Sequence, residues 1–466
     1  MKKTLAMLLA LVMVLACIPA MAEDVENPYE EDGVVIRIDP ATGKPYDLGG
    51  MEIIIAQWWG SDWHETIGEA ETSAAEATEE YRLWLEETYN FTIKEAYATE
   101  WGATTAQDFT NFVTTGGGEE NYVWVINDGY YNAPVKAELA YDLSTLDCLD
   151  FEEDKWNDML RELTTVDGKI YGMRPQVAEP RLGVFFNYRL LAEAGIDGES
   201  LYDMQQDGTW TWEAFEDLCQ KLQRDVDNDG LPDQYAMMSL NTRLWFAALT
   251  ANNTGFVLTD EEGRYVNAAE TQQFLDTANW IMDMTRTYEK PVPEGANWDY
   301  FESAFINAEV PLMVHEEYFS GSLEDMEDDF GFVFFPKGPN ATSHTWAPGD
   351  NAYLIPGCYD AERAWKIAFA FNLFTDPTPG YTDDDDWMNG YYNKYRDDRA
   401  VEETLATMRD VSSQAFWYPS IIAGYDLGEQ YVWDVAAGNA TPAEKSEQMR
   451  ATWQAFLDEA NALNGK

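Results

Sequence analysis

The chain has 466 residues, of which 45% are hydrophobic and 14% aromatic, and its formal net charge is −56. This composition excludes an intrinsically disordered chain, and the length exceeds what one hydrophobic core supports, so we expect a two-lobed globular protein. The charge excludes nucleic acid and anionic lipid as partners and attracts cations, although it also suits an exported protein that must stay in solution.

The first residues have the pattern of an export signal. Two lysines precede an apolar run at residues 5–15 that is too short to span a bilayer, and Ala20-Met21-Ala22 is a small-x-small cleavage site. We therefore predict a signal peptide at residues 1–22 and export of the mature protein. The alternative is a lipid anchor at the outer face of the membrane, because Cys17 ends a partial lipobox.

The first predicted strand carries aromatic and acidic residues at its end. Residues 23–50 are acidic and rich in turn formers, which predicts a surface arm, and residues 51–57 form an apolar strand that Trp58, Trp59 and Asp62 follow. Ligands of open α/β sheets bind beyond the carboxyl ends of strands, so all three residues are ligand-binding candidates. Burial in the core is the alternative for the tryptophans.

The next elements repeat this arrangement. Apolar spacing predicts a helix at residues 76–89 and a strand at residues 91–96. A third strand at residues 122–126 ends in Asn127 and Asp128. The strand-end rule makes both of them ligand-binding candidates, with a structural turn as the alternative.

Residues 168–191 contain the predicted passage from one lobe to the other. A turn and a short strand stop at Pro175, and a second apolar strand at residues 184–186 runs directly into a helical pattern. Two short strands around a proline-containing connector are typical of a hinge, since a few residues at element ends absorb the rotation between rigid bodies. The alternative is an ordinary strand-loop-strand within one domain.

Three segments around this passage carry a family resemblance. Gly-Lys-Ile-Tyr-Gly at 168–172 is followed by Phe-Phe-Asn-Tyr-Arg-Leu-Leu-Ala-Glu-Ala-Gly-Ile at 185–196 and by Thr-Trp-Thr-Trp-Glu-Ala-Phe at 209–215. In this order they resemble the middle of an extracellular solute-binding protein of the maltose-binding-protein-like, sugar-transporter class. The resemblance implies an α/β fold of the two-lobed, type II periplasmic-binding-protein-like kind. It also implies a hinge, a ligand cleft between the lobes and delivery of the ligand to the membrane permease of an ABC transporter.

The same resemblance sets the expected lobes and the expected lobe 2 site. We assign residues 51–174 and 350–405 to lobe 1 and residues 175–349 and 406–466 to lobe 2. In the family an aromatic residue near the helix that follows strand 235–240 stacks on the ligand, and Trp245 stands at that place.

Further lobe 2 candidates follow along the chain. Trp298 begins a predicted helix. The family implies a ligand-facing aromatic and a hydroxyl acceptor after the strand at residues 311–314. Tyr318 and Glu316 match them, with Phe319 and Glu317 as alternatives. The segment that returns to lobe 1 and a loop near the C-terminus supply the last candidates, Trp346, Asp350 and Tyr425.

The acidic loop at residues 225–233 is the most specific chemical motif in the sequence. Its carboxylates at alternate positions and its glycine match the first three quarters of a calcium-binding loop. We predict a structural Ca²⁺ bound by the Leu231 carbonyl and the side chains of Asp225, Asp227, Asp229 and Asp233. The twelfth position is Ala236 and not the bidentate glutamate of an EF-hand, so a solvated acidic turn is the alternative. We expect no organic cofactor.

Aromatic rings and polar groups at strand ends suit a sugar. Flat rings cover the apolar face of a pyranose, while carboxylates and amides bond its hydroxyls. We therefore expect a monomeric binding protein, not an enzyme, that captures a neutral carbohydrate such as an oligosaccharide and passes it to a permease.

Two rival functions stay open. A polyamine or another cationic solute is one alternative ligand on the same fold, because rings and carboxylates also suit a cation. A glycoside-active enzyme is the other alternative, since such enzymes need only a pair of carboxylates. With 85 acidic residues, finding a pair is uninformative, and the sequence has no nucleophile-elbow, zinc-protease or phosphate-loop motif.

Overall fold

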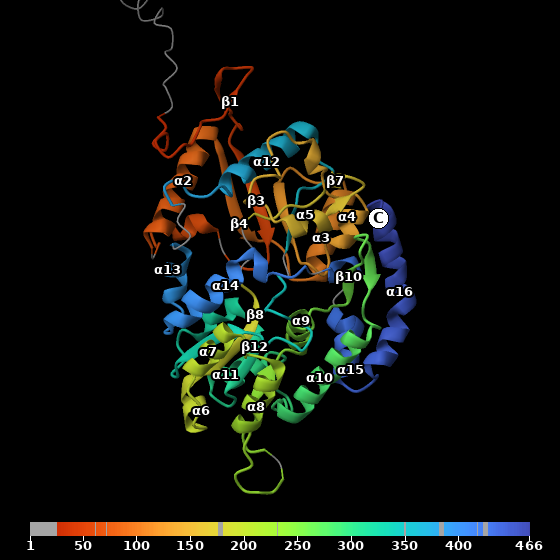
Figure 1. Cartoon of the computed structure of the whole chain (residues 1–466). Coiled ribbons are helices and arrows are strands. Elements are labelled where there is room, and N and C mark those ends of the chain that lie inside the picture. Colours follow the sequence, from red (N-terminus) through yellow and green to blue (C-terminus); the bar gives the residue numbers. More distant parts are fainter. Residues whose placement is uncertain are drawn as a thin grey trace, which may run out of the picture.

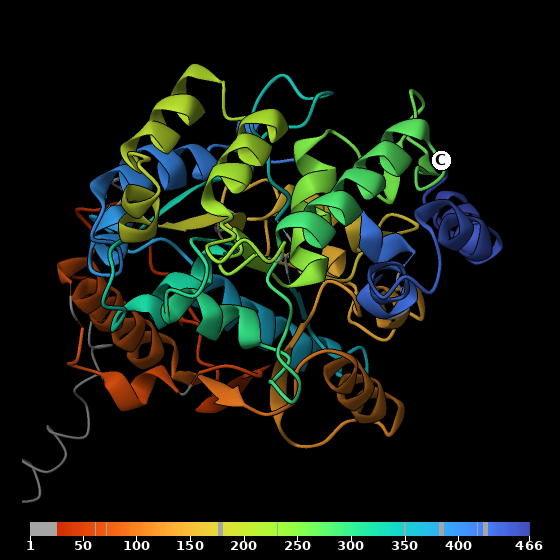
Figure 2. The same cartoon turned by 90° about the horizontal axis from the view of Figure 1, so that it is seen from below.

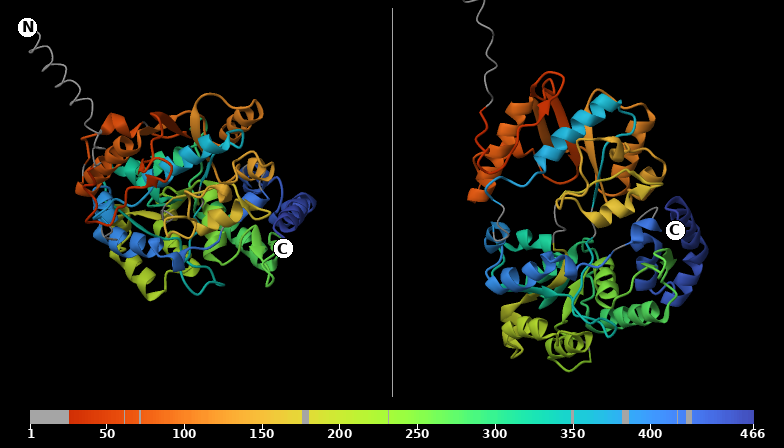
Figure 3. Two further views of the ribbon diagram at one scale, coloured as in Figure 1. Left: turned by 90° about the horizontal axis from the view of Figure 1, so that it is seen from above. Right: turned by 45° about the horizontal axis from the view of Figure 1, so that its top comes forward.

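The computed structural model describes residues 26–60, 62–70, 72–175, 180–230, 232–348, 351–381, 386–416, 418–422 and 427–466. The predicted signal peptide and the alternative anchor at Cys17 lie outside these residues. Within them, no helix combines the length and the apolar character needed to cross a membrane. The chain forms two α/β lobes, each built on a four-stranded sheet (Figure 1; Figure 3, right).

Lobe 1 is the upper lobe in Figure 1. Its strand order is β14-β5-β3-β4, in which β3 (Met51–Gln57), β4 (Phe91–Tyr97) and β5 (Asn121–Ile126) run parallel and β14 (Ala352–Leu354) runs antiparallel to β5. α2 (Ser73–Tyr89) and α12 (Ala361–Phe374) pack on one face, and α3 (Ala103–Thr114) packs on the other. Helices on both faces bury most of β3 and β5, as their apolar sequences predict, whereas the edge strand β4 keeps exposed residues.

Lobe 2 has the strand order β13-β8-β12-β9. β12 (Leu312–Glu316) runs parallel to β9 (Met237–Ser239) and antiparallel to β8 (Leu182–Asn187), which also pairs with β13 (Phe330–Phe334). Its helices, seen from below in Figure 2, surround a single large core. They include α6 (Tyr188–Glu193), α7 (Glu199–Asp207), α8 (Trp212–Leu222), α9 (Asn241–Ala251), α10 (Gln272–Tyr288) and α11 (Tyr300–Ile306).

The smaller elements connect or cover these lobes. Three two-stranded hairpins pair β1 (Ile38–Asp39) with β2 (Lys44–Pro45), β6 (Thr165–Val166) with β7 (Lys169–Ile170), and β10 (Val257–Thr259) with β11 (Tyr265–Asn267). The remaining α-helices of the described chain are α4 (Asn132–Lys136), α5 (Asp158–Leu163), α13 (Asp386–Tyr392), α14 (Ala406–Arg409), α15 (Trp433–Ala436) and α16 (Pro442–Leu463).

The predicted N-terminal arm packs on lobe 1 in its described part. The Tyr29 ring lies edge-on to Tyr81 and Trp84 of α2, at centroid distances of 5.0 and 5.2 Å. The Trp84 indole N–H donates to the Glu26 carbonyl, and the Arg37 amide donates to the Tyr89 hydroxyl at 2.9 Å. Aromatic packing therefore fixes the arm, while the β1–β2 hairpin projects from the top of the lobe (Figure 1).

The structure corrects one predicted lobe boundary. Residues 395–405 were expected in lobe 1, yet they supply the lobe 2 core with Tyr395, Ala400, Val401 and Leu405. Phe374, at the end of α12, still packs in the core of lobe 1. The third passage between the lobes therefore lies between α12 and α13, and the first two lie between β7 and β8 and between β13 and β14.

Direct contacts also join the lobes on the side where α16 runs along both of them (Figure 1). The Tyr131 hydroxyl of lobe 1 donates to Ser420 Oγ at 3.2 Å, and the Asn132 side-chain amide donates to the Ile421 carbonyl at 3.2 Å. Nearby, the Tyr265 hydroxyl of lobe 2 donates to Glu162 of lobe 1 at 3.0 Å. These hydrogen bonds close one side of the space between the lobes.

The Asp397 carboxylate fixes residues 395–405 on lobe 2, which generates a first prediction. It accepts hydrogen bonds from the hydroxyls of Tyr188, at 2.7 Å, and of the fully buried Tyr202. We expect Asp397→Ala to lower the free energy of unfolding by roughly 1–3 kcal/mol, because the buried Tyr202 hydroxyl loses its acceptor, whereas the Tyr188 hydroxyl can still donate to Glu199 at 2.8 Å. Urea unfolding measures the change. The matched variant Asp398→Ala alters an exposed neighbour and should change stability by less than about 0.5 kcal/mol; equal effects would contradict this assignment.

A second prediction concerns Glu289, which follows α10 and accepts hydrogen bonds from the amide and the hydroxyl of Ser239, both at 2.7 Å. Burial raises the pKa of Glu289 to about 7 from the ordinary 4.5 of glutamate. The folded chain then holds this proton at pH values where the unfolded chain has released it. The contribution of Glu289 to the stability should therefore fall as pH rises from about 4.5 to about 7 and stay constant above that.

Glu289→Gln removes this titration, so the variant should be more stable than the wild type at pH 8 by roughly 3 kcal/mol and similar to it at pH 4. Unfolding midpoints measured from pH 4 to pH 8 test this result. Glu294→Gln, at an exposed position of the same loop, is the control and should keep the wild-type slope. An unchanged slope in Glu289→Gln would show that other groups cause the pH dependence.

Candidate ligand-binding site

A cavity lies between the two lobes and measures about 100 Å³. Lobe 1 lines it with residues that follow β4 and β5, and lobe 2 lines it with residues of β8, β12 and α9. The lining residues are Trp101, Asn127, Asp128, Gly129, Tyr130, Leu182, Arg243, Phe246, Glu316, Ala347, Pro419, Ser420 and Leu427. Its volume is below the roughly 300–1,000 Å³ of typical small-molecule sites.

The strand ends explain why these residues meet. β5 ends at Ile126, and the turn that follows brings Asn127, Asp128 and Tyr130 to the carboxyl edge of the lobe 1 sheet. β12 ends with Glu316, and α9 begins immediately after its parallel neighbour β9. Parallel strands present their carboxyl ends at one edge, where ligands of α/β proteins bind, and here the edges of both sheets border one cavity.

An ion pair dominates the electrostatics of this cavity. Arg243 Nε and Nη2 both lie 2.9 Å from Glu316 Oε2. Burial alone would lower the pKa of Arg243, but the Glu316, Tyr318 and Asp128 side chains raise it overall. Burial alone would raise the pKa of Glu316, but Arg243 and then Arg181 lower it. The Glu316 and Asp128 carboxylates thus both raise the pKa of Arg243, and Asp128 does so from lobe 1.

Aromatic rings stand beside these charges. Trp101 and Tyr130 of lobe 1 pack edge-to-face with ring centroids 6.4 Å apart, and Phe246 of lobe 2 lines the same cavity. Next to Glu316, Tyr318 is half-exposed and the Arg181 guanidinium lies 5.9 Å from its ring centroid. Burial, followed by the Glu316 charge, raises the pKa of Tyr318 to about 12, so this hydroxyl is protonated at neutral pH.

Three of the residues predicted from sequence line the cavity. They are Asn127, Asp128 and Glu316, each at the end of a parallel strand. Trp58, Trp59 and Asp62 lie at the end of β3, as predicted, but outside the cavity lining of the described chain. The Trp58 ring packs partly into the lobe 1 core, Trp59 is exposed, and the Asp62 carboxylate lies 2.7 Å from His64 Nδ1.

Two predicted ligand contacts are corrected. Trp245 is fully buried in the lobe 2 core against Phe274 and Tyr431. Arg243 and Phe246, three residues apart on α9, share a helix face and line the cavity, whereas Trp245 points to the opposite face. Trp346 is also buried, because its indole N–H donates to the Met408 carbonyl at 2.9 Å and to Ser413 Oγ at 3.1 Å.

The remaining candidates lie elsewhere. Trp298 is 77% exposed, precedes α11 and is outside the cavity lining of the described residues. Tyr318 lies beside Glu316 at the rim. Asp350 and Tyr425 fall outside the described residues.

Sequence reasoning did not single out Trp101, Arg243, Phe246 or Ser420. The strand-end rule applied to β4 points to Trp101, and the helical period of α9 pairs Arg243 with Phe246. Ser420 reaches the cavity only through a contact with Tyr131, which is 289 residues away in sequence, so no local pattern indicates it.

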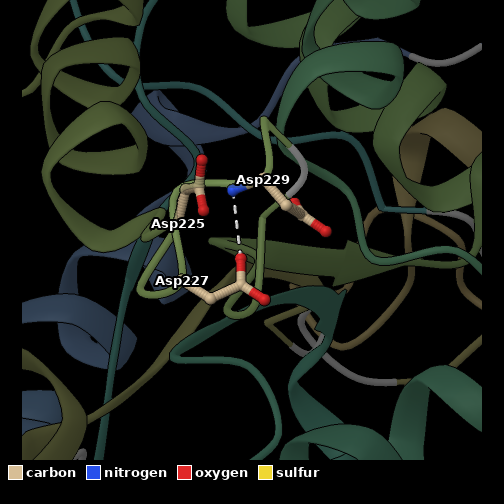
Figure 4. Close-up of side chains that lie close together, drawn as sticks. All are labelled: Asp225, Asp227 and Asp229. Atoms are coloured by element: carbon tan, nitrogen blue, oxygen red, sulfur yellow. Dashed lines mark hydrogen bonds between the residues drawn. The ribbon is translucent and has the colours of Figure 1, made fainter.

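The acidic loop after α8 lies at the bottom of lobe 2 in Figure 1, at the end that points away from lobe 1. Oxygens of Asp225, Asp227 and Asp229 all lie within 4.8 Å of one another (Figure 4). This spacing fits ligands around one Ca²⁺, whose bonds to oxygen measure about 2.3–2.6 Å. Asp233 instead accepts backbone hydrogen bonds from Val226, at 2.6 Å, and from Asp227, at 3.2 Å. Leu231 lies outside the described residues.

Comparisons with known proteins agree with this architecture. The model of the family described as "Bacterial extracellular solute-binding protein" matches residues 68–371. Among curated proteins, none matches the sequence.

Solved structures of similar fold include three binding proteins with different ligands. The maltose/maltodextrin-binding domain MalE from Bdellovibrio bacteriovorus, bound to maltotriose, has 14% identity and a TM-score of 0.60 over 88% of this chain and 99% of that chain. The GacH receptor of Streptomyces glaucescens, whose structures include a complex with acarbose, has 12% identity and a TM-score of 0.56 over 88% and 99%. UgpB from Mycobacterium tuberculosis, in complex with glycerophosphocholine, has 15% identity and a TM-score of 0.57 over 88% and 99%. At these identities the likeness concerns the fold.

Proposed function

Because the chain belongs to the family of bacterial extracellular solute-binding proteins, we propose that it captures a neutral carbohydrate between its lobes for the permease of an ABC importer. The observation that carries the proposal is the cavity itself, in which rings and polar groups from both lobes stand side by side. We expect the exported protein to act as a monomer, with the segment up to Ala22 removed or with a lipid anchor at Cys17.

The side chains of the cavity suit the two kinds of surface on a sugar. Trp101, Tyr130 and Phe246 offer ring faces or edges for the C–H face of a pyranose. Asn127, Asp128 and Ser420 offer donors and acceptors for its hydroxyls. A ligand that touches residues from both lobes binds the closed arrangement better than an open one and shifts the equilibrium towards it.

The charge balance favours a neutral ligand over a polyamine. Although the chain as a whole is strongly acidic, Glu316 at the cavity is paired with Arg243. The Arg181 charge also lowers the pKa of Glu316, and the Asp128 charge raises the pKa of Arg243. A cation that entered would meet the field of the arginines together with that of the acids. The polyamine alternative therefore has less support from this site.

The same ion pair argues against glycoside cleavage. A general acid of a glycosidase needs a raised pKa, so that it holds a proton at working pH. Arg243 lowers the pKa of Glu316 and keeps it ionised. Binding without turnover is therefore our proposal, and the absence of hydrolysis products after long incubation with oligosaccharides would support it.

The ring contacts provide the first test. A thermal-shift screen against linear oligosaccharides and polyamines finds ligands, since a ligand of the folded state raises the melting temperature. Calorimetry should then give a dissociation constant about tenfold higher for Trp101→Ala and for Phe246→Ala, because truncating a ring that packs on the ligand costs more than about 1 kcal/mol. Trp298→Ala, which removes an exposed ring outside the cavity lining, is the matched control and should bind like the wild type.

Salt dependence separates the two ligand classes in the same assay. Affinity for a neutral sugar should change by less than about twofold between 50 mM and 500 mM salt, whereas affinity for a polyamine should fall steeply because salt screens charge attraction. A wild-type protein that binds only polyamines, with such a fall, would overturn the sugar proposal.

We also propose that Asp225, Asp227 and Asp229 bind a structural Ca²⁺. Their alternate positions, the mutual distances of their oxygens and the turn at Gly230, with φ of +89°, support this assignment. The site is remote from the cavity, so the ion would stabilise the loop and take no part in ligand binding.

Calorimetric titration of metal-free protein with CaCl₂ tests the calcium assignment. We expect one binding event that Asp227→Asn with Asp229→Asn abolishes and that Asp325→Asn, at an exposed acidic position elsewhere, preserves. Bound Ca²⁺ should also raise the melting temperature. If the wild type gives no heat at millimolar Ca²⁺, the motif is a solvated acidic turn.

A further inference from the structure

His64 lies between two carboxylates in lobe 1. Its Nδ1 atom is 2.7 Å from Asp62 Oδ1, and its Nε2 atom is 3.1 Å from Glu86 Oε2. The side chains of His64, Asp62 and Glu86 are 24%, 23% and 11% exposed, so the cluster is largely shielded from solvent. In the described chain none of the three lines the cavity between the lobes, so the ligand site does not explain them.

Both ring nitrogens of His64 need a proton in this arrangement. An ionised carboxylate can only accept hydrogen bonds, and a neutral imidazole has one N–H group and one lone pair. A neutral ring would therefore donate to one carboxylate and turn a lone pair towards the other. The imidazolium has two N–H groups and donates to both carboxylates, so the geometry favours the charged form.

The charges around the ring favour the same form. Besides Asp62 and Glu86, they include Glu95 of β4 and Arg82 of α2, since Arg82 acts on both glutamates and Asp62 acts on Glu95. Three acids and one guanidinium leave two uncompensated negative charges beside a neutral ring and one beside an imidazolium. Burial alone would lower the pKa of His64, but the bonds to Asp62 and Glu86 raise it overall from the ordinary 6.5.

The same cluster covers the open edge of the lobe 1 sheet. β4 is the last strand in the order β14-β5-β3-β4, so one of its sides faces no other strand of the described chain. On that side the Ile93 N–H donates to Glu86 Oε1 at 2.8 Å, and the Ile93 carbonyl accepts from the Trp63 indole N–H at 2.9 Å. An uncovered strand edge is a place where another chain can pair, so these two bonds protect the sheet.

Glu86 joins the histidine to this edge. One of its oxygens accepts from Ile93 and the other bonds to His64. The rings of His64 and Trp63 also pack together, with centroids 4.0 Å apart. Loss of the charged contact at His64 would therefore loosen both groups that cover Ile93.

We propose that His64 is a pH-sensitive clamp on the edge of lobe 1. As an imidazolium it holds residues 62–66 against α2 and keeps Ile93 covered. As the pH rises above neutral the ring loses its proton and the turn loosens. The direction follows from linkage, because a histidine that gains acidic partners on folding stabilises the fold at low pH and loses this contribution as its proton leaves.

A titration followed by NMR tests the protonation. Among the three histidines of the chain, the ring signals that His64→Gln removes should titrate in the wild type with a midpoint above 6.5. Glu86→Gln replaces a carboxylate with a neutral amide and should lower this midpoint by about one pH unit. Glu65→Gln, at an exposed position of the same turn, is the matched control and should leave it unchanged. A wild-type midpoint at or below 6.5 would overturn the proposal.

Amide hydrogen exchange tests the release of the edge. His64→Phe keeps a ring beside Trp63 but cannot donate a hydrogen bond. At pH 6 the peptide covering residues 91–97 should exchange about tenfold more slowly in the wild type than in this variant, because a hydrogen bond to a charged group is lost. At pH 9 the difference should shrink to about threefold or less. Comparing both proteins at the same pH cancels the intrinsic pH dependence of exchange.

Melting temperatures show whether each variant is folded, and His64→Ala takes the place of His64→Phe if the latter is not. Glu65→Gln should exchange like the wild type at both pH values. If the wild type and the His64 variant exchange equally at pH 6, the histidine does not hold the edge. If they differ by the same factor at pH 6 and pH 9, the contact is not pH-sensitive. Either result overturns the clamp.

Discussion

The binding site depends on one constraint, which is that parallel strands end at a common edge. β3, β4 and β5 of lobe 1 end at one edge of their sheet, and β9 and β12 of lobe 2 end together at one edge of theirs. Beyond this edge the backbone groups no longer form the hydrogen bonds of the sheet. The side chains of the turns that follow are not covered by a helix, so a ligand can reach them. Because residues from both edges line one cavity, a single small molecule can touch both lobes at once.

Charge is distributed differently on the surface and in the cleft. The chain carries a formal charge of −56, yet the partly buried carboxylate of Glu316 is matched by Arg243 within the same lobe. A buried ion pair costs desolvation energy, and removing one partner leaves an uncompensated charge. The pair thus adds no net charge to the cavity, and the Asp128 carboxylate of lobe 1 also raises the pKa of Arg243.

The connections between the lobes limit how they can move. α16 anchors in lobe 2 through Trp453 and Leu457, yet Lys136 of lobe 1 pairs with its Glu459 at 3.0 Å, and Leu463 packs on lobe 1. Together with the contacts of Tyr131 and Asn132, these residues hold the lobes on one side. Opening of the cleft would therefore require these polar contacts to break or to slide, which couples the ligand site to a distant helix.

Local sequence patterns determined the elements and part of the site. The apolar strand at residues 51–57 has the predicted bounds. The helix predicted at residues 76–89 and the strand predicted at residues 91–96 are α2 and β4, which differ from the predictions at one end only. Alternation and helical spacing depend on residues a few positions apart, so the chain displays them directly. The strand-end rule likewise identified Asn127 and Asp128, because it follows from strand direction alone, whereas Glu316 was expected from the family resemblance.

Tertiary packing decided the rest. Trp245 is buried because Tyr431, far away in sequence, packs against its ring. Trp346 is buried where the distant Met408 carbonyl accepts its indole N–H. Residues 395–405 belong to lobe 2 because Tyr188 and Tyr202 donate to Asp397 across 209 and 195 positions. A tryptophan has the same local pattern whether it lines a cleft or fills a core. Whether its side chain is buried depends on which other elements pack against it, and that packing exists only after the whole chain has folded.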